Sequence, residues 1–254
     1  MFNDYFHMFP WTEVSSKAVG ADIGCGSGRW AALVAPRVGY LHLVDASSGA
    51  LSVARQNLSG QSGVSFHQAS VDNLPFEAEY LDFAYALGVL HHVPDTREAI
   101  KSIARVLKPG APFLIYLYYA FDQRPGWFRA LWRCTDLIRR VISILPSRAK
   151  NICCDAIAVT VYLPLARSAW LLDRMGILPP AWPLAYYRDR TFYVLRTDSL
   201  DRFGTRLEQR FTRNEIEQML LAAGFEHIRF SDRQPFWCSV SFKRETHTLT
   251  AMEE

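Results

Sequence analysis

Short apolar runs alternate with longer segments of helical spacing along most of the chain. Apolar and β-branched runs predict strands at about 19–23, 40–44, 64–68, 81–87, 113–118, 226–231 and 236–243. Apolar positions three and four residues apart predict helices between them, for example at 29–35 and from Ser48 to Leu58. Strands that alternate with helices in this way predict an α/β fold with a mostly parallel sheet.

Local signals mark where two of the later helices begin. Asp95, with Glu98 three residues on, predicts a helix start before the apolar positions of residues 100–107. Thr212 and Glu215 form the same pattern, and Gly224 is a suitable end for the helix that follows. Between the strand at 113–118 and this last helix, about 90 residues intervene, which is far more than a connection needs.

The segment Asp22-Ile23-Gly24-Cys25-Gly26-Ser27-Gly28 lies where the first strand should end. Glycines at alternate positions let the backbone adopt positive φ and let a ligand lie close to it. Asp45 ends the second predicted strand, 17 residues after Gly28, where a carboxylate can accept both hydroxyls of a ribose. The two signals together predict a nucleoside-containing cofactor on a doubly wound sheet.

The details of the loop decide between cofactors. A dinucleotide fingerprint requires glycine where this chain has Arg29, and the Gly-Lys phosphate loop is absent. Asp22 suits a ligand with a positive amino group. The loop resembles the first motif of the class I S-adenosylmethionine-dependent methyltransferases, [DE]-x-G-x-G-x-G. The alternative is a dinucleotide-binding or non-binding Rossmann-like domain, in which the glycines only permit close packing.

Later segments resemble the same family in the same order. They are residues 70–76, which end in L-P-F; residues 81–95, which contain L-H-H; residues 106–110, which contain L-K-P-G; and residues 212–225, which end in A-G-F. The resemblance implies a Rossmann-like, doubly wound, seven-stranded sheet whose last strand is antiparallel. It also implies S-adenosylmethionine as cofactor and S-adenosylhomocysteine as product. The resemblance places the cofactor against Asp22, Gly24, Cys25, Gly26, Gly28, Asp45, Ala46, Ser70, Val71, Ala86 and Leu87.

One position departs from the family pattern. Ser70 stands where relatives often have an adenine-binding aspartate, and its hydroxyl would bind the adenine amino group more weakly. Asp72 is a substitute, or else a surface turn residue.

Two adjacent histidines are the candidate catalytic residues. His91 and His92 follow the fourth predicted strand, and histidine titrates near neutral pH, so either suits removal of a proton from a methyl acceptor. The alternative for each is packing or capping of the helix that begins at Asp95. On a strand end the two side chains would point to opposite sides, which argues against a metal site.

The segment 120–206 is predicted to be a helical insertion after the fifth strand. It contains several aromatic residues, among them Trp127, Trp132, Tyr186, Tyr187, Phe192 and Tyr193. From Asp122 to Arg206 it has 14 basic and 7 acidic residues, a net +7, which leaves about −4 for the rest of a chain of net +3. Three interpretations remain open: a cap whose apolar side completes the core, a substrate lid, or peripheral membrane contact by a basic amphipathic helix.

Composition sets broader limits. The net charge of +3 gives no case for nucleic-acid binding, and five cysteines without a C-x-x-C pair fit a reducing compartment. We expect no leader segment at the start of the chain. The uncharged stretch 156–166 is too short to span a bilayer. The expected location is cytoplasmic.

The sequence thus predicts two parts. Residues 1–119 and 207–254 form an S-adenosylmethionine-binding methyltransferase domain, and 120–206 form the insertion, with a role as substrate lid. The expected activity is methylation of a small or amphiphilic acceptor at O or N, the acceptor being apolar with an anionic group. The alternative is an inactive cofactor-binding scaffold or regulatory partner. The aromatic segment from Asn3 to Glu13 either covers the cofactor or packs on the edge of the sheet.

Overall fold

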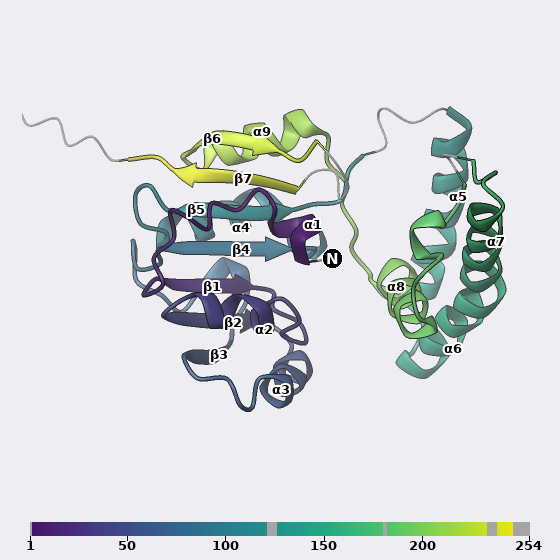
Figure 1. Cartoon of the computed structure of the whole chain (residues 1–254), viewed down its shortest axis with the longest axis horizontal. Coiled ribbons are helices and arrows are strands. Elements are labelled where there is room, and N and C mark those ends of the chain that lie inside the picture. The colour runs from purple at the N-terminus through teal and green to yellow at the C-terminus, as the bar shows by residue number, and fades with distance from the viewer. Residues whose placement is uncertain (1, 121–125, 180–181, 233–237, 246–254) are drawn as a thin grey trace, which may run out of the picture. The chain divides into compact units, whose positions relative to one another are not determined.

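The computed structural model describes residues 2–120, 126–179, 182–232 and 238–245, except for the side chains of Trp127 and Arg129. The chain divides into two compact units (Figure 1). Unit 1 comprises Met1–Ala120 and Gln209–Glu254, and unit 2 comprises Phe121–Glu208. These boundaries differ by one or two residues from those expected for the two parts.

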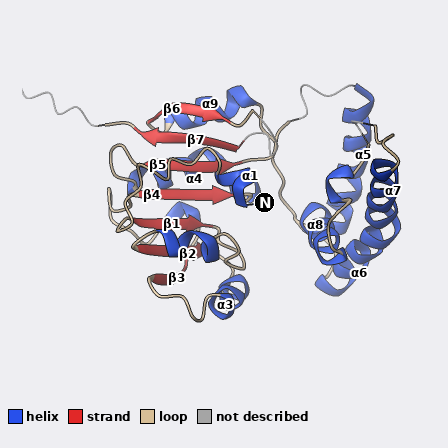
Figure 2. Cartoon of the chain, viewed as in Figure 1, coloured by secondary structure: helices blue, strands red, loops and turns tan. Residues whose placement is uncertain are grey.

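Unit 1 is built on one seven-stranded sheet, and this confirms the predicted fold class (Figure 2). The strand order is β3-β2-β1-β4-β5-β7-β6, with β7 antiparallel to both neighbours and the pairs from β3 to β5 parallel. The strands are β1 (Val19–Ile23), β2 (Tyr40–Asp45), β3 (Val64–Gln68), β4 (Phe83–Leu87), β5 (Pro112–Tyr116), β6 (Phe225–Phe230) and β7 (Cys238–Lys243). Residues 236–237, which were expected to begin the last strand, lie outside the described residues. The parallel order reverses beside β1, where such sheets bind ligands at their carboxyl ends.

The helices of unit 1 are α1 (Phe2–Phe6), α2 (Ala31–Val34), α3 (Ser48–Asn57), α4 (Thr96–Val106) and α9 (Arg213–Ala222). The predicted caps are present. The Asp95 carboxylate accepts hydrogen bonds from the backbone of Arg97 and Glu98 (2.9 and 3.1 Å), and Thr212 forms a capping box with Glu215. The first predicted helix is shorter than expected, because a 3-10 turn at Ala35–Arg37, which contains Pro36, replaces its last part.

The sheet is buried on both faces. Alternate residues of β4 point to opposite sides: Ala84 and Ala86 pack in the cluster that contains α4 and α9, whereas Phe83 and Tyr85 pack with residues of α2, α3 and the N-terminal segment. Phe6 and Phe9 are almost fully buried against this second face, and Phe6 lies edge-on to Tyr85 with centroids 5.2 Å apart. The N-terminal aromatic segment therefore covers a face of the sheet beside β4, instead of an edge.

Unit 2 consists of helices in its described part. They are α5 (Gly126–Ser143), α6 (Ser147–Ile157), α7 (Leu163–Arg174) and α8 (Phe192–Gly204), with a π-helical turn at Ala158–Tyr162 and a 3-10 turn at Ala185–Tyr187. The expected break near Pro164 is wrong, because α6, the π turn and α7 form one helix from Ser147 to Arg174. The wider π turn lies directly before the proline, where it accommodates the residue that lacks an N–H.

The core of unit 2 is small, and α5 does not pack as expected. Ile142, Cys154, Tyr162, Ala166, Leu195 and Phe203 form its buried cluster. On α5, Arg139 is buried while Leu137, Val141 and Ile144 are exposed. Arg133 and Arg140 are exposed, as the cap interpretation expects, but the buried Arg139 and the exposed Leu137, Val141 and Ile144 differ from it.

The helix Ser147–Arg174 has the length and mean hydropathy (1.4 over its best window) of a membrane-crossing helix, and 28% of that window is buried. These properties concern length and composition alone. The uncharged stretch 156–166 underestimated the length of this apolar helix, because the residues on either side of the stretch belong to the same helix.

Candidate functional site

The glycine loop after β1 is held in place by the end of β2. The backbone amides of Gly24 and Cys25 donate to the carbonyl of Val44 (2.7 and 3.0 Å), and the amide of Gly26 donates to Asp45 Oδ2 (2.9 Å). Both glycines have positive φ (74° and 53°). A Cβ on Gly24 would lie 2.4 Å from Val89 Cγ1, whereas a Cβ on Gly26 would meet nothing within 4 Å. Gly24 therefore permits packing, and Gly26 borders open space that a ligand can occupy.

Asp45 connects this loop to the start of α3. In addition to the bond from Gly26, its Oδ1 accepts a hydrogen bond from the amide of Ser47 (2.8 Å). An ionised carboxylate has about four acceptor positions, so capacity remains for ribose hydroxyls. Asp45 is half-buried at the carboxyl end of β2, where the sequence predicted a ribose contact.

Asp22 is a buried carboxyl group beside a buried tyrosine. It pairs in register with Tyr85 of β4, and both side chains are almost fully buried. Burial raises the pKa of Asp22 to about 7; the Tyr85 hydroxyl opposes the rise, and the negative charge of Asp45 adds to it. Asp22 Oδ2 is buried and makes no hydrogen bond of ordinary geometry in the described part of the chain, and the buried Tyr85 hydroxyl is the polar group beside the carboxyl. Buried polar atoms without a hydrogen bond are rare in native proteins and often mark a place where a ligand or ion supplies the missing partner.

The unpartnered carboxylate oxygen fits the amino-acid end of S-adenosylmethionine. A positive amino group would supply the missing donor to Asp22, and the backbone at Gly26 is open to the approach of a ligand, because a Cβ there would meet nothing within 4 Å. The sequence did not single out Tyr85. The signal that could have found it is a tyrosine in an otherwise apolar buried strand, one strand away from Asp22.

The other predicted cofactor residues divide by exposure. Ala46 and Ser70 are exposed, and Leu87 is half-buried. Cys25, Gly28, Val71 and Ala86 are buried; the side chain of Ala86 lies in the core beside α4, so the backbone is what it offers to a ligand. The Ser70 hydroxyl donates a hydrogen bond to the Asp72 carboxylate, which engages both residues considered for the adenine contact.

His91 and His92 lie together, which differs from the expectation that they point apart. Strand β4 ends at Leu87, Gly88 has φ of 80°, and Leu90–His92 form a 3-10 turn. Their ring centroids are 4.2 Å apart. The correction has a simple cause: alternation to opposite sides holds for strands, and this segment is no longer a strand.

The two histidines differ in environment. His91 is fully buried and stacks on Tyr118 with ring centroids 3.7 Å apart, and neither of its ring nitrogens has a hydrogen-bond partner in the described part of the chain. Burial, together with His92 and Arg210, lowers the pKa of His91 to about 2, so the ring stays neutral. His92 is half-buried. His91 is therefore a weak proton acceptor, and His92 is the better placed of the two to act as a base.

Aromatic side chains gather at the carboxyl ends of β4 and β5. Tyr116 lies 5.3 Å from Tyr5 of the N-terminal helix and 6.0 Å from Tyr118 (centroid distances). Together with the stacked His91, they form an aromatic cluster next to the expected site of methyl transfer. Rings of this kind contact planar or apolar ligands and exclude water.

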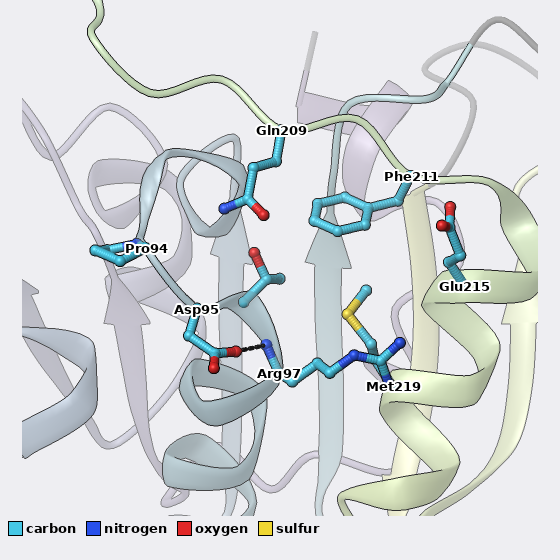
Figure 3. A pocket seen from close by; sticks show the side chains of 8 residues that line it. Pro94, Asp95, Arg97, Gln209, Phe211, Glu215 and Met219 are labelled. Atoms are coloured by element: carbon cyan, nitrogen blue, oxygen red, sulfur yellow. Dashed lines mark hydrogen bonds between the residues drawn. The ribbon is translucent and has the colours of Figure 1, made fainter.

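The chain returns to unit 1 beside the histidines. The Gln209 amide donates to the His91 carbonyl (2.9 Å), and Gln209 Nε2 donates to the Val93 carbonyl (2.5 Å). Phe211 pairs with Tyr119 as an isolated parallel bridge. Gln209 and Phe211 line a pocket of about 130 Å³ next to the start of α4 and α9 (Figure 3). Its lining residues are Pro94, Asp95, Thr96, Arg97, Gln209, Phe211, Glu215 and Met219.

This pocket is smaller than sites for small molecules, which usually exceed about 300 Å³. Its importance is positional: both ends of the insertion meet beside His91. Gln209 was missed in the sequence because its partners precede it by more than 110 residues. No group of three or more histidine, cysteine, aspartate or glutamate side chains in the described residues is arranged to hold a metal ion.

Comparison with known proteins gives the family. Residues 21–115, which run from the glycine loop through β5, match the family described as "Methyltransferase domain". This segment, residues 21–115, is therefore a methyltransferase domain of the class I S-adenosylmethionine-dependent type. The chain is 35% identical over 101 residues to an uncharacterised methyltransferase, YcgJ, of Bacillus subtilis (strain 168), a match that covers 39% of this chain and 40% of the relative.

A second curated relative matches the same part of the chain, and a solved structure shares its fold. A 2-phytyl-1,4-naphtoquinone methyltransferase of Nostoc punctiforme is 36% identical over 107 residues, which is 40% of this chain and 46% of the relative. The solved structure of an S-adenosylmethionine-dependent methyltransferase from Methanosarcina mazei has a TM-score of 0.54 at 18% identity and covers 94% of this chain and 99% of its own. The chain thus spans less than half the length of these two curated relatives. S-adenosylmethionine is the cofactor of this methyltransferase family.

Proposed function

We propose that the protein transfers a methyl group from S-adenosylmethionine to an oxygen or nitrogen atom of a small or amphiphilic acceptor in the cytoplasm. The observation that carries the proposal is the buried Asp22 carboxylate, whose Oδ2 makes no hydrogen bond of ordinary geometry in the described part of the chain, beside a glycine loop that borders open space. The name of the Nostoc relative, a naphthoquinone methyltransferase, favours a ring-bearing acceptor of low polarity.

The chain's own residues divide the work as follows. Asp22 would hold the amino group of the cofactor and Asp45 its ribose, so that the reacting end is fixed at the carboxyl ends of β4 and β5. When bound, S-adenosylmethionine supplies an electrophilic methyl group. The aromatic cluster at Tyr116 and Tyr118 would hold the acceptor and exclude water.

The acceptor must also lose a proton. We assign this proton to His92, because the environment of His91 keeps that ring neutral and weakly basic. The unprotonated ring nitrogen of His91 can instead accept a hydrogen bond from the acceptor and orient it. The His92 ring would take the proton as the acceptor O–H or N–H bond breaks, and the methyl group would pass to the acceptor atom while sulfur keeps the electron pair of the broken C–S bond.

The insertion is proposed as the acceptor-binding element. It leaves unit 1 after Tyr119 and returns at Gln209, and both points lie beside His91. An acceptor with an anionic group would find many arginines on this unit. Trp127, one of the aromatic residues expected to line an acceptor pocket, has a side chain outside the described residues.

The test is transfer of label from methyl-labelled S-adenosylmethionine to fractionated small molecules and lipids, with release of S-adenosylhomocysteine measured in parallel. We expect a labelled product with the wild type and at least a tenfold lower rate with Asp22→Asn at limiting cofactor concentration, because a charge-assisted bond is lost. Tight binding of S-adenosylhomocysteine without any transfer would overturn the proposal in favour of an inactive scaffold.

A further inference from the structure

The α5 helix of unit 2 exposes aliphatic side chains to solvent, although a helix of a water-soluble protein usually buries them. Its exposed residues Leu137, Ile138, Val141 and Ile144 are 66%, 51%, 58% and 68% exposed. Spacings of three and four residues place them along one side of the helix. In a soluble unit such aliphatic side chains would form the core, and a contiguous exposed patch of them marks an interaction surface.

The opposite side of α5 faces inward and carries polar residues, beside the buried Ile142. Asp136, Arg139 and Ser143, again three and four residues apart, are 7%, 4% and 2% exposed. Arg139 pairs with Asp136 (2.7 Å) and donates to the backbone carbonyls of Thr205 and Arg206 (2.9 and 3.1 Å). These contacts lie within unit 2 and fix the polar side against the end of α8, which leaves the aliphatic side outward.

The long helix Ser147–Arg174 shows the same tendency. Its buried positions are mostly small residues, among them Cys154, Ala158, Ala166 and Ala169. Large aliphatic residues such as Ile152 and Leu171 are instead 68% and 53% exposed. Small residues between helices and large apolar residues outward are typical of helices that pack in a lipid environment.

Unit 2 has an excess of basic side chains, which favours binding to a negatively charged surface. Several acidic side chains are neutralised within the unit: Asp155 pairs with Arg196, Asp173 with Arg188, and Glu208 with Arg202. Several basic residues of the described part have no acidic partner: Arg133, Arg148, Lys150, Arg167, Arg174, Arg190 and Arg206. The guanidinium of Arg174 lies 4.0 Å from the centroid of the Trp170 ring, a pair suited to a membrane interface.

We infer that the aliphatic side of α5, with the unpaired basic residues of unit 2, docks unit 2 on the surface of a bilayer that contains anionic lipids. The apolar residues enter the headgroup and acyl boundary, and the cations attract the lipid phosphates. A second copy of this chain is a poorer partner for the same surface, because it would bring unpaired positive charges together. The inference goes beyond the proposed function, because docking requires neither cofactor nor methyl transfer. Its consequence is that amphiphilic acceptors are reached at the membrane.

The test is flotation of the full chain with vesicles of phosphatidylcholine, alone or mixed with phosphatidylglycerol. We expect binding to the mixed vesicles, weaker binding to phosphatidylcholine alone, and partial release at high salt. The triple variant Leu137→Gln, Val141→Gln, Ile144→Gln should reduce the partition coefficient by about tenfold or more. These residues are exposed, so circular dichroism and thermal unfolding of the variant should match the wild type.

Matched controls come from unit 1. Leu33, Val53 and Leu221 are 44%, 44% and 42% exposed there, and their triple change to Gln should leave flotation unaltered. Arg148→Gln with Arg167→Gln should weaken binding to the anionic vesicles, whereas Lys17→Gln with Arg105→Gln should not. Should the triple variant of α5 unfold, the single change Ile144→Gln with the same vesicles replaces it.

Three results would overturn the inference. One is a wild type that does not float with either vesicle. Another is a folded α5 variant that floats as well as the wild type. The third is self-association of the wild type that the α5 variant abolishes while vesicle binding is unchanged, which would make the surface a dimer interface. A chain that floats but transfers no methyl group would instead contradict only the proposed function.

Discussion

Affinity for S-adenosylhomocysteine should fall steeply below pH 7 because of Asp22. The product carries the same amino-acid end as the cofactor, and its amino group requires an ionised carboxylate. Burial raises the pKa of Asp22 to about 7 in the protein without ligand, so below this pH binding must expel a proton. With a much lower pKa in the complex, the dissociation constant rises by about 25-fold between pH 7.5 and pH 5.5.

Isothermal titration calorimetry at pH 5.5, 6.5 and 7.5 measures this dependence. The upper limit keeps the ligand's own amino group protonated throughout. Asp22→Asn should bind more weakly at pH 7.5 and show almost no dependence on pH, whereas Asp45→Asn should bind more weakly but keep most of it. A flat profile for the wild type, or an unchanged slope in Asp22→Asn, would refute the assignment of the amino group to Asp22.

The raised pKa of Asp22 also makes the stability of the ligand-free protein depend on pH. The pKa of Asp22 is raised from 3.8 when the chain folds, so the folded state binds the proton more tightly than the unfolded state does. Its contribution to stability is therefore complete below pH 4 and is lost as the pH rises to about 7, a loss of about 4 kcal/mol. The free energy of unfolding of Asp22→Asn should lack this decline, so a plot of unfolding free energy against pH should fall less between pH 4 and 7 for the variant than for the wild type. Equal curves for both proteins from pH 4 to 7 would contradict the raised pKa.

Three further predictions concern the loop, the ribose contact and the base. Gly26→Ala should weaken S-adenosylhomocysteine binding at a cost of only about 1 kcal/mol in stability, whereas Gly24→Ala should lower the unfolding temperature strongly, because its Cβ would lie 2.4 Å from Val89; equal effects of the two changes on stability would contradict this reading of the loop. Asp45→Ala should lose two hydrogen bonds to the ribose, about 1.5–3 kcal/mol each, and Asp45→Asn about half of that; unchanged affinity by calorimetry in both variants would remove Asp45 from the site. His92→Ala should lower turnover about 10²–10⁴-fold while S-adenosylhomocysteine binding is kept, and His91→Ala should also lower the unfolding temperature; activity within a few-fold of wild type for both would mean that neither acts as the base.

The sequence predicted the parts of the site that lie within one βα unit. The glycine loop and Asp45 are encoded in consecutive residues, and short apolar runs mark β1 to β5 because buried parallel strands are apolar on both faces. The pairing of Asp22 with Tyr85 was not predicted, because it depends on the register between β1 and β4, which are distant in the chain. Gln209 was missed for the same reason.

Two errors arose where a local rule ended earlier than expected. The alternation of a strand was extended to His91 and His92, but Gly88 with its positive φ ends β4 and a 3-10 turn follows. Pro164 was taken to break the helix, but a π turn before it preserves the helix. For α5 the spacing showed an amphipathic helix and could not show which side is inward, because amphipathic spacing is equal for a helix in water and one at a membrane.

The most direct test of the account is a calorimetric comparison of S-adenosylhomocysteine with a nicotinamide dinucleotide on the same preparation at pH 7.5. We expect one binding site per chain for S-adenosylhomocysteine and no detectable heat for the dinucleotide, because Arg29 replaces the third glycine that dinucleotide sites require. Binding of the dinucleotide together with failure to bind S-adenosylhomocysteine would contradict the assignment of the site.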